Sequence, residues 1–127
     1  IVRHLISAAL IVVAIIHLLP LSGVLGSERL NALYGIRIDE PNLAILMRHR
    51  AVLFGMLGAF LLFAAFRPAF QLAALVAGFV SVLTFLGLAW SVAVYNAQLG
   101  RVVTADIVAL ACLVVGAAAY AMSTRGG

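Results

Sequence analysis

Long apolar segments constrain this chain more than any other feature of its sequence. Between Arg67 and Arg101 there is no charged side chain at all. About 20 apolar residues in a helix are enough to cross the roughly 30 Å hydrocarbon core of a bilayer. We therefore predict an all-α integral membrane protein, with a single domain at residues 1–127. Its four predicted spans lie at residues 2–19, 41–66, 70–97 and 102–122.

The composition agrees with a chain whose main partner is the lipid bilayer. Hydrophobic residues make up 66% of the sequence and charged residues 9%, whereas a soluble domain is about 45–50% apolar and about 25% charged. A water-soluble fold of this composition would expose large apolar patches. The net charge of +4 comes from arginines that occur singly near the predicted helix ends. Because they form no basic stripe, we do not expect nucleic acid as a partner.

Local signals mark the ends of the predicted spans. Pro20 ends the first span, and Pro41 suits the first turn of the second. Asp39 or Glu40 would favour the positive end of that second helix. We expect Gly100 to close the third span.

The connections predict the topology. All are short except residues 21–40, so neighbouring helices should be antiparallel and form an up-down-up-down four-helix bundle. The long loop should contain a short helix at residues 28–34, ended by Gly35. Its Leu30, Leu33 and Tyr34 are expected to lie on the membrane surface.

Basic residues are equally frequent on the two sides of this topology, and their distribution sets orientation by the positive-inside rule. The side with the two termini carries arginines and no acid, whereas the other side also carries the acids of the long loop. We expect the termini to be cytoplasmic.

Polar residues inside the predicted spans gather on the side of the long loop. A charged group within a bilayer costs several kcal/mol, so such residues usually face the bundle or a water-filled cavity. Their convergence predicts a polar pocket at this end of the bundle, with no metal ligands assigned. The candidate ligand-binding residues are His17, Arg48, His49, Trp90, Ser91, Tyr95 and Asp106.

Helical spacing predicts which of the neighbouring arginines points inward. Arg48 shares a face with Gly55 and Gly58, and small residues mark helix contacts in membranes. Arg50 shares a face with Phe54, which we expect to face lipid, with Arg50 extending towards the headgroups.

The third predicted span carries one polar stripe, which should face the interior and bring Ser91 and Tyr95 towards Arg48. The stripe consists of Ser81, Thr84, Ser91, Tyr95 and Gln98. Structural roles also fit the polar residues of the spans. The hydroxyls of the stripe would bond to their own helix, the aromatic side chains would form a belt at the membrane surface, and Arg48 would form an ion pair with Asp106.

Three stretches resemble small bacterial four-helix membrane proteins of pseudomonads and their relatives, which often carry the label phosphopantetheine adenylyltransferase. They are HLLPLSGVLG at 17–26, LYG at 33–35 and PNLAILMRHRAVLFG at 41–55. The chain is also similar, at the level of fold, to the DoxX-type superfamily, some of whose members accompany quinone-linked oxidoreductases. The resemblance implies a multi-pass protein of the bacterial inner membrane.

The adenylyltransferase activity itself requires features that this sequence lacks. The soluble enzyme uses a doubly wound α/β domain and a nucleotide-binding His-x-Gly-His motif. None of the three histidines here is followed by x-Gly-His, and there is no strand–glycine loop–helix unit to hold a triphosphate. We do not expect this activity, and we assign no catalytic residue.

Three functional hypotheses follow. In the first, the pocket binds a small amphipathic ligand, either a quinone-like molecule or a metabolite. Arg48 would bind its oxygen-rich group, balanced by Asp106, while His17, His49 and Tyr95 would donate or relay protons.

In the second hypothesis, the chain is a structural or accessory subunit of a larger membrane complex or a homo-oligomer. In the third, His17 and His49 hold a haem or take part in a metal site. The sequence alone identifies no cofactor.

Overall fold

The computed structural model of the chain describes residues 2–21, 26–36, 40–92 and 94–126. These residues form helices and no strand, which confirms the predicted all-α class. The long helices are α1 (Val2–Leu18), α3 (Pro41–Ala65), α4 (Gln71–Val92) and α5 (Ala97–Gly126), and the short ones are α2 (Ser27–Tyr34) and η2 (Pro68–Phe70). Four helices are long and apolar enough to cross a membrane, as in a multi-pass membrane protein.

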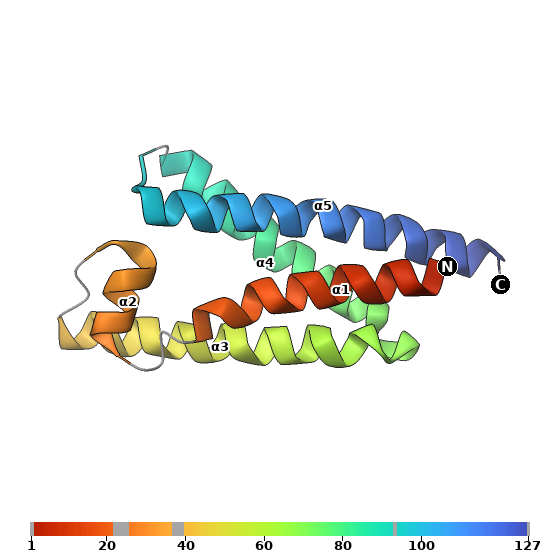
Figure 1. Cartoon of the computed structure of the whole chain (residues 1–127), viewed down its shortest axis with the longest axis horizontal. Coiled ribbons are helices and arrows are strands. Elements are labelled where there is room, and N and C mark those ends of the chain that lie inside the picture. Colours follow the sequence, from red (N-terminus) through yellow and green to blue (C-terminus); the bar gives the residue numbers. More distant parts are fainter. Residues whose placement is uncertain (1, 22–25, 37–39, 93, 127) are drawn as a thin grey trace.

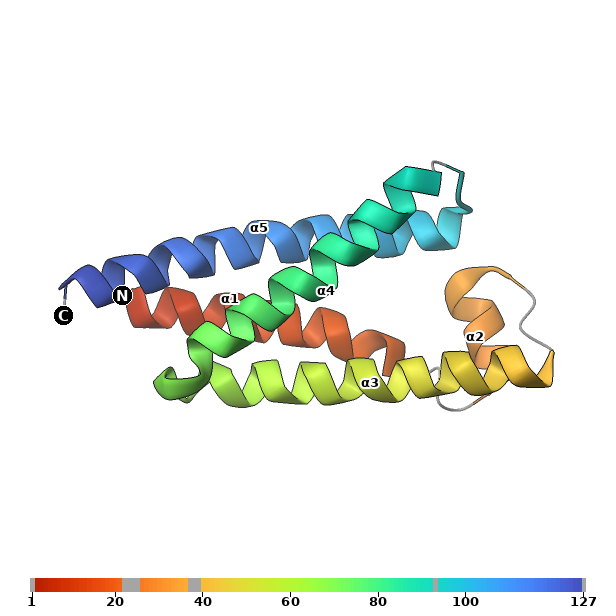
Figure 2. The same ribbon diagram turned by 180° about the vertical axis from the view of Figure 1, so that it is seen from behind.

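The long helices form one bundle, in which consecutive members run in opposite directions (Figure 1). The N- and C-termini lie at one end, and α2 lies at the other. Helix α1 packs most extensively on α5 and α3, whereas α4 packs on α5 and to a lesser extent on α3. Figure 2 shows α4 crossing obliquely, so that it starts beside α3 and diverges from it towards the α2 end.

The contact between α1 and α3 depends on small residues. A Cβ added at Gly58 would lie 2.8 Å from Leu18 Cγ, and one at Gly55 would meet Leu21 Cδ1. The two helices can approach this closely because glycine has no side chain, as is common for helix pairs in membranes. Gly55 and Gly58 of the predicted small-residue stripe thus form a helix-packing surface, whereas Arg48 on the same stripe is exposed.

The core consists of aliphatic side chains from all four long helices, whereas the outer surface of each helix is also apolar. The largest fully buried side chains are Ile6, Leu10, Val13, Leu61, Val82, Leu86 and Leu113. Exposed side chains of the same kind include Ile15 at 53%, Leu46 at 66% and Leu88 at 69%.

Polar side chains bind the free carbonyl groups at the end of α3. Ser7 Oγ donates a hydrogen bond of 2.6 Å to the Ala65 carbonyl, and Gln71 Nε2 donates one of 3.4 Å to the same oxygen. The last carbonyls of a helix have no partner within it. These bonds satisfy one of them inside the bundle, next to the stop at Pro68.

The start of α3 agrees with the sequence prediction. The Glu40 carboxylate accepts a hydrogen bond of 2.8 Å from the Leu43 amide, and Pro41 occupies the first turn. Backbone hydrogen bonds from Leu43 and Asn42 hold the pKa of Glu40 below its ordinary value. The alternative cap, Asp39, lies outside the described residues.

The boundary between α4 and α5 differs from the prediction. Helix α4 ends at Val92 and α5 begins at Ala97, several residues before the predicted start at 102. The Asn96 Oδ1 atom accepts a 2.8 Å hydrogen bond from the Leu99 amide, which is the bond of an N-terminal helix cap. The predicted stop at Gly100 is wrong, because Gly100 lies inside the first turns of α5.

Helix α2 packs its Leu33 and Tyr34 side chains against the bundle, whereas the sequence prediction placed them on the membrane surface. Tyr34 is only 5% exposed, and Leu33 packs beside it with residues of α3 and α5. Gly35 ends the helix as predicted, in the left-handed conformation with φ 66°. The Asn96 side chain donates a 2.7 Å hydrogen bond to the Tyr34 carbonyl, which joins α2 to α5. Leu30 was also predicted to lie on the membrane surface, but its side chain is outside the described part of the structure.

Candidate functional site

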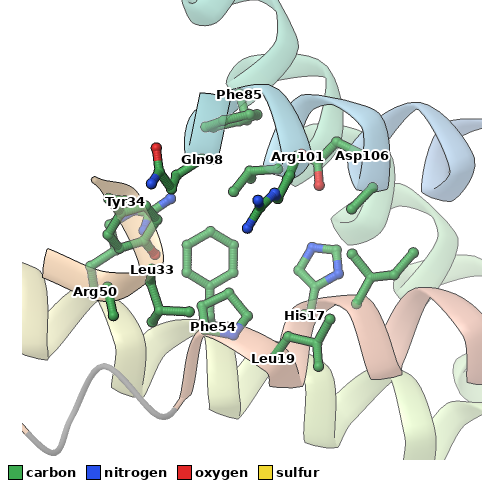
Figure 3. Close-up of a pocket in the computed structure, with 15 residues that line it drawn as sticks. His17, Leu19, Leu33, Tyr34, Arg50, Phe54, Phe85, Gln98, Arg101 and Asp106 are labelled. Carbon is green, nitrogen blue, oxygen red and sulfur yellow. The ribbon is translucent and has the colours of Figure 1, made fainter. Parts of the chain in front are cut away.

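A cavity of about 250 Å³ lies at the α2 end of the bundle, between α2 and the four long helices (Figure 3). Apolar residues form most of its wall, with Phe54 of α3 and Phe85 of α4 among them. The polar side chains that line it are His17, Tyr34, Arg50, Gln98, Arg101 and Asp106. This combination of an apolar wall and a few convergent polar groups is typical of small-molecule sites.

His17 is the buried polar residue of the cavity, with 3% of its surface exposed. Its Nδ1 atom lies 2.9 Å from the Val13 carbonyl oxygen, and its Nε2 atom lies 2.8 Å from Ser81 Oγ. Because a carbonyl oxygen can only accept, Nδ1 donates. In the neutral ring Nε2 then accepts from the Ser81 hydroxyl. Both nitrogens therefore have partners, and His17 links α1 to α4.

Arg50 extends from α3 towards α2. Its Nη1 atom donates a 2.6 Å hydrogen bond to the Tyr34 hydroxyl. Its guanidinium carbon lies 4.4 Å from the centroid of the Phe54 ring and 5.4 Å from that of Tyr34. A guanidinium within about 6 Å of a ring face gains a cation–π attraction. These contacts hold a half-buried positive charge at the cavity wall.

Helix α5 supplies the opposite wall. In Figure 3, Arg101 and Asp106 extend from α5 on the side facing His17 and Phe54. Asp106 is half-buried, and the positive charge of Arg50 acts on its carboxylate. The cavity therefore combines two arginines with one carboxylate.

The structure brings two of the predicted ligand-binding residues into this cavity, His17 and Asp106. The others are exposed and do not line it: Arg48, His49, Trp90, Ser91 and Tyr95. The predicted orientations of two arginines are reversed, since Arg50 lines the cavity and Arg48 faces outward.

The orientations of Arg48 and Arg50 are reversed because α3 extends further than α1 at the α2 end of the bundle. The small-residue stripe of α3 packs on α1 at Gly55 and Gly58, next to the end of α1. Arg48 lies about two turns earlier on the same stripe. Figure 1 shows that α3 extends past the end of α1 beneath α2, so α1 does not cover the first turns of α3. Arg50 lies on the adjoining face, with Phe54.

The predicted polar stripe of the third span separates into different roles. Ser81 faces inward and bonds to His17. Thr84 Oγ1 donates to the Val80 carbonyl at 2.6 Å, and Ser91 Oγ donates to the Leu88 carbonyl at 2.7 Å. These last two hydroxyls are exposed and bond to their own helix, as Ser and Thr commonly do.

Arg101 was not predicted as a site residue, because residues 98–101 were interpreted as a connection between two spans. Once Asn96 is recognised as the helix cap, the cavity-lining positions show a helical period. They are Gln98, Arg101, Val102, Ala105 and Asp106, spaced i, i+3, i+4, i+7 and i+8. The sequence therefore contained a signal for the start of α5, namely an asparagine at the capping position before an apolar helix.

The arrangement does not support a haem or metal site built on two histidines. His49 is exposed, and both ring nitrogens of His17 have hydrogen-bond partners. Among the described residues there is no group of three or more His, Cys, Asp or Glu side chains able to hold a metal ion.

Comparison with known proteins gives no family for this chain: no family model, curated protein or solved structure matches it significantly.

Proposed function

We propose that the chain is an integral membrane protein that binds a small amphipathic ligand in the cavity at the α2 end. The ligand carries an anionic or oxygen-rich polar group, which Arg50 and Arg101 bind. The aromatic rings of Tyr34, Phe54 and Phe85 contact its apolar part. One observation carries this proposal, namely the convergence of two arginines on a largely apolar cavity between the helices.

The exposed surface supports placement in a bilayer. Large aliphatic side chains face outward on all four long helices, for example Ile15, Leu53, Val80 and Val114. Such a surface would be unfavourable in water and is favourable in lipid. In this proposal the protein lies in a bacterial inner membrane with its termini on the cytoplasmic side, so the cavity lies near the opposite surface.

The charges in the cavity indicate the chemistry of the ligand. Asp106 offsets part of the positive charge, and one positive charge remains when both arginines and the carboxylate are ionised. Guanidinium groups present planar arrays of donors that match carboxylates and other paired oxygens. A carboxylate, or the carbonyl oxygens of a quinone-like ring, would accept hydrogen bonds from these donors.

The proposal is tested with purified protein in detergent and two soluble probes, hexanoate and a methyl-substituted benzoquinone. At least one probe should raise the melting temperature saturably, because a ligand that binds only the folded state stabilises it. Arg101→Gln should remove most of this shift. Arg101 is exposed, so the replacement leaves the packed core unchanged.

The control is Arg48→Gln, which removes an arginine outside the cavity and should leave the probe-induced shift intact. If neither probe changes the melting temperature, or if both variants respond as the wild type does, the binding proposal is wrong. The chain would then be better described as a structural subunit of a larger membrane complex.

A further inference from the structure

A second space of about 200 Å³ lies between α3 and α4, and we call it the α3–α4 groove. It is lined by Arg50, Leu53, Phe54, Leu57 and Ser81. Two of these residues, Arg50 and Phe54, also line the main cavity. The two spaces are therefore neighbours with common walls.

The partition between the two spaces includes one aromatic ring and one hydrogen-bonded pair. The Phe54 ring lies beside His17, with 5.7 Å between ring centroids. His17 in turn bonds to Ser81, which lines the groove. Phe54 is half-buried, and its ring and the Arg50 side chain belong to the wall that the two spaces share. A change of the Phe54 rotamer would open a connection between cavity and groove.

The groove opens on the side of the bundle. It exists because α4 diverges from α3 towards the α2 end (Figure 2). Leu53 at its rim is 50% exposed, and Val80 of α4 is 58% exposed. In a membrane-embedded bundle this surface faces acyl chains, so the α3–α4 groove opens to lipid and not to water.

From this geometry we infer that the ligand is a single-chain amphiphile. Its polar head occupies the main cavity, and its apolar tail runs through the α3–α4 groove into the bilayer. This inference rests on the proposed ligand-binding function. The volume of about 250 Å³ lies below the roughly 300–1,000 Å³ of ordinary ligand sites, so the cavity suits a head group alone. An apolar tail needs an apolar exit, and the groove supplies one.

The path of the tail is tested by photo-crosslinking in detergent. The probes are decanoate and a decyl-substituted benzoquinone, each with a diazirine in the middle of its chain. Labelling should concentrate on Leu53, Leu57 and Ser81, and an excess of the matching short probe should suppress it. A separate apolar groove lies between α1 and α5, with Ala8 and Ala111 among its lining residues. This α1–α5 groove serves as the internal control.

A blocking substitution tests the same path through affinity. Leu53→Trp fills the groove from its rim and should weaken binding of the tailed probe by about tenfold, the effect of overpacking. Binding of the short probe should stay within about twofold. Met56→Trp is the matched control, because Met56 is 63% exposed on the same helix and lines neither space. Comparing variants in one detergent cancels partitioning of the tail into micelles.

The outcomes separate this inference from the function on which it rests. If the short probes bind in an Arg101-dependent way but the tail labels the α1–α5 groove, or labels without suppression, only the tail path is wrong. Equal affinity of the tailed probe for Leu53→Trp and the wild type would also overturn it. If no short probe binds, both proposals fail together.

Discussion

The Arg50 guanidinium donates a 2.6 Å hydrogen bond to the hydroxyl of Tyr34, and this bond connects the α3 wall of the cavity to α2. Tyr34 is 5% exposed, and Asn96 of the α4–α5 connection binds its carbonyl group. One residue of α2 is therefore held by both α3 and the segment that begins α5. The position of α2 over the cavity therefore depends on these two polar contacts together with the apolar packing of Tyr34 and Leu33.

Tyr34→Phe should loosen α2 without unfolding the bundle. A hydrogen bond to a charged group contributes about 1.5–3 kcal/mol, so amide hydrogen exchange in α2 should accelerate by about tenfold or more. Exchange in α4, which lacks this contact, should stay unchanged. Tyr95→Phe is the control, since Tyr95 is 39% exposed and does not line the cavity. Equal exchange in the two variants would contradict a role for the Arg50–Tyr34 bond.

Ser81→Ala should destabilise the bundle, because it leaves His17 Nε2 buried without its partner. The expected cost is about 1–3 kcal/mol, the penalty for an unsatisfied buried polar group. Reversible unfolding in mixed detergent measures it. Thr84→Ala should cost less than about 0.5 kcal/mol, since Thr84 is exposed and bonds only to the carbonyls of its own helix.

A double-mutant cycle sharpens the Ser81 prediction. In the His17→Phe background, Ser81→Ala should lose most of its effect, because the nitrogen that it leaves unpaired is already gone. Additive effects of the two substitutions would show that the His17–Ser81 contact does not couple α1 to α4.

Gly58→Ala should weaken the contact between α1 and α3. The new Cβ would lie 2.8 Å from Leu18 Cγ and 3.1 Å from the Ala14 carbonyl oxygen, which belongs to the backbone and cannot rotate away. Overpacking of this kind costs about 1–3 kcal/mol. Gly87→Ala offers a matched control, because a Cβ there meets nothing within 4 Å. That substitution should stabilise α4 by up to about 1 kcal/mol through helix propensity.

Glu40→Ala should lower stability in a pH-dependent way. Hydrogen bonds from the Leu43 and Asn42 amides lower the pKa of Glu40, so the carboxylate stabilises the fold above its ordinary pKa of 4.5. This contribution disappears as the pH falls through the lowered pKa and the carboxylate is protonated. Thermal unfolding from pH 7 downward should therefore show the difference between wild type and variant narrowing below about pH 4.5. A constant difference would contradict the capping role.

Much of the fold was predictable because its signals are local. Apolar length identified the four long helices, and Pro41 marked the start of the second one. The exact start of α5 was also encoded locally, in the Asn96 cap, but was obscured by the glycine that follows it. Gly100 costs a helix about 1 kcal/mol, which is comparable to the contribution of an asparagine cap.

The candidate site was less predictable, because its composition depends on which helices lie next to one another. Helical phase identified the small-residue face of α3 but not which part of that face α1 covers. Arg48 and Arg50 therefore exchanged roles. Similarly, Ser81 and Ser91 share one predicted stripe, yet only Ser81 lies opposite another polar group, His17.

The early end of α1 has a consequence for how ligand size is determined. Helix α1 ends at Leu18, whereas α3 continues past that end beneath α2 (Figure 1). The cavity occupies the space that α1 leaves when Pro20 interrupts its hydrogen bonding. Moving this proline by one turn would change the depth of the cavity while every charged side chain stayed in place. Selection for the dimensions of a ligand and selection for its charge can therefore act on different positions of the chain.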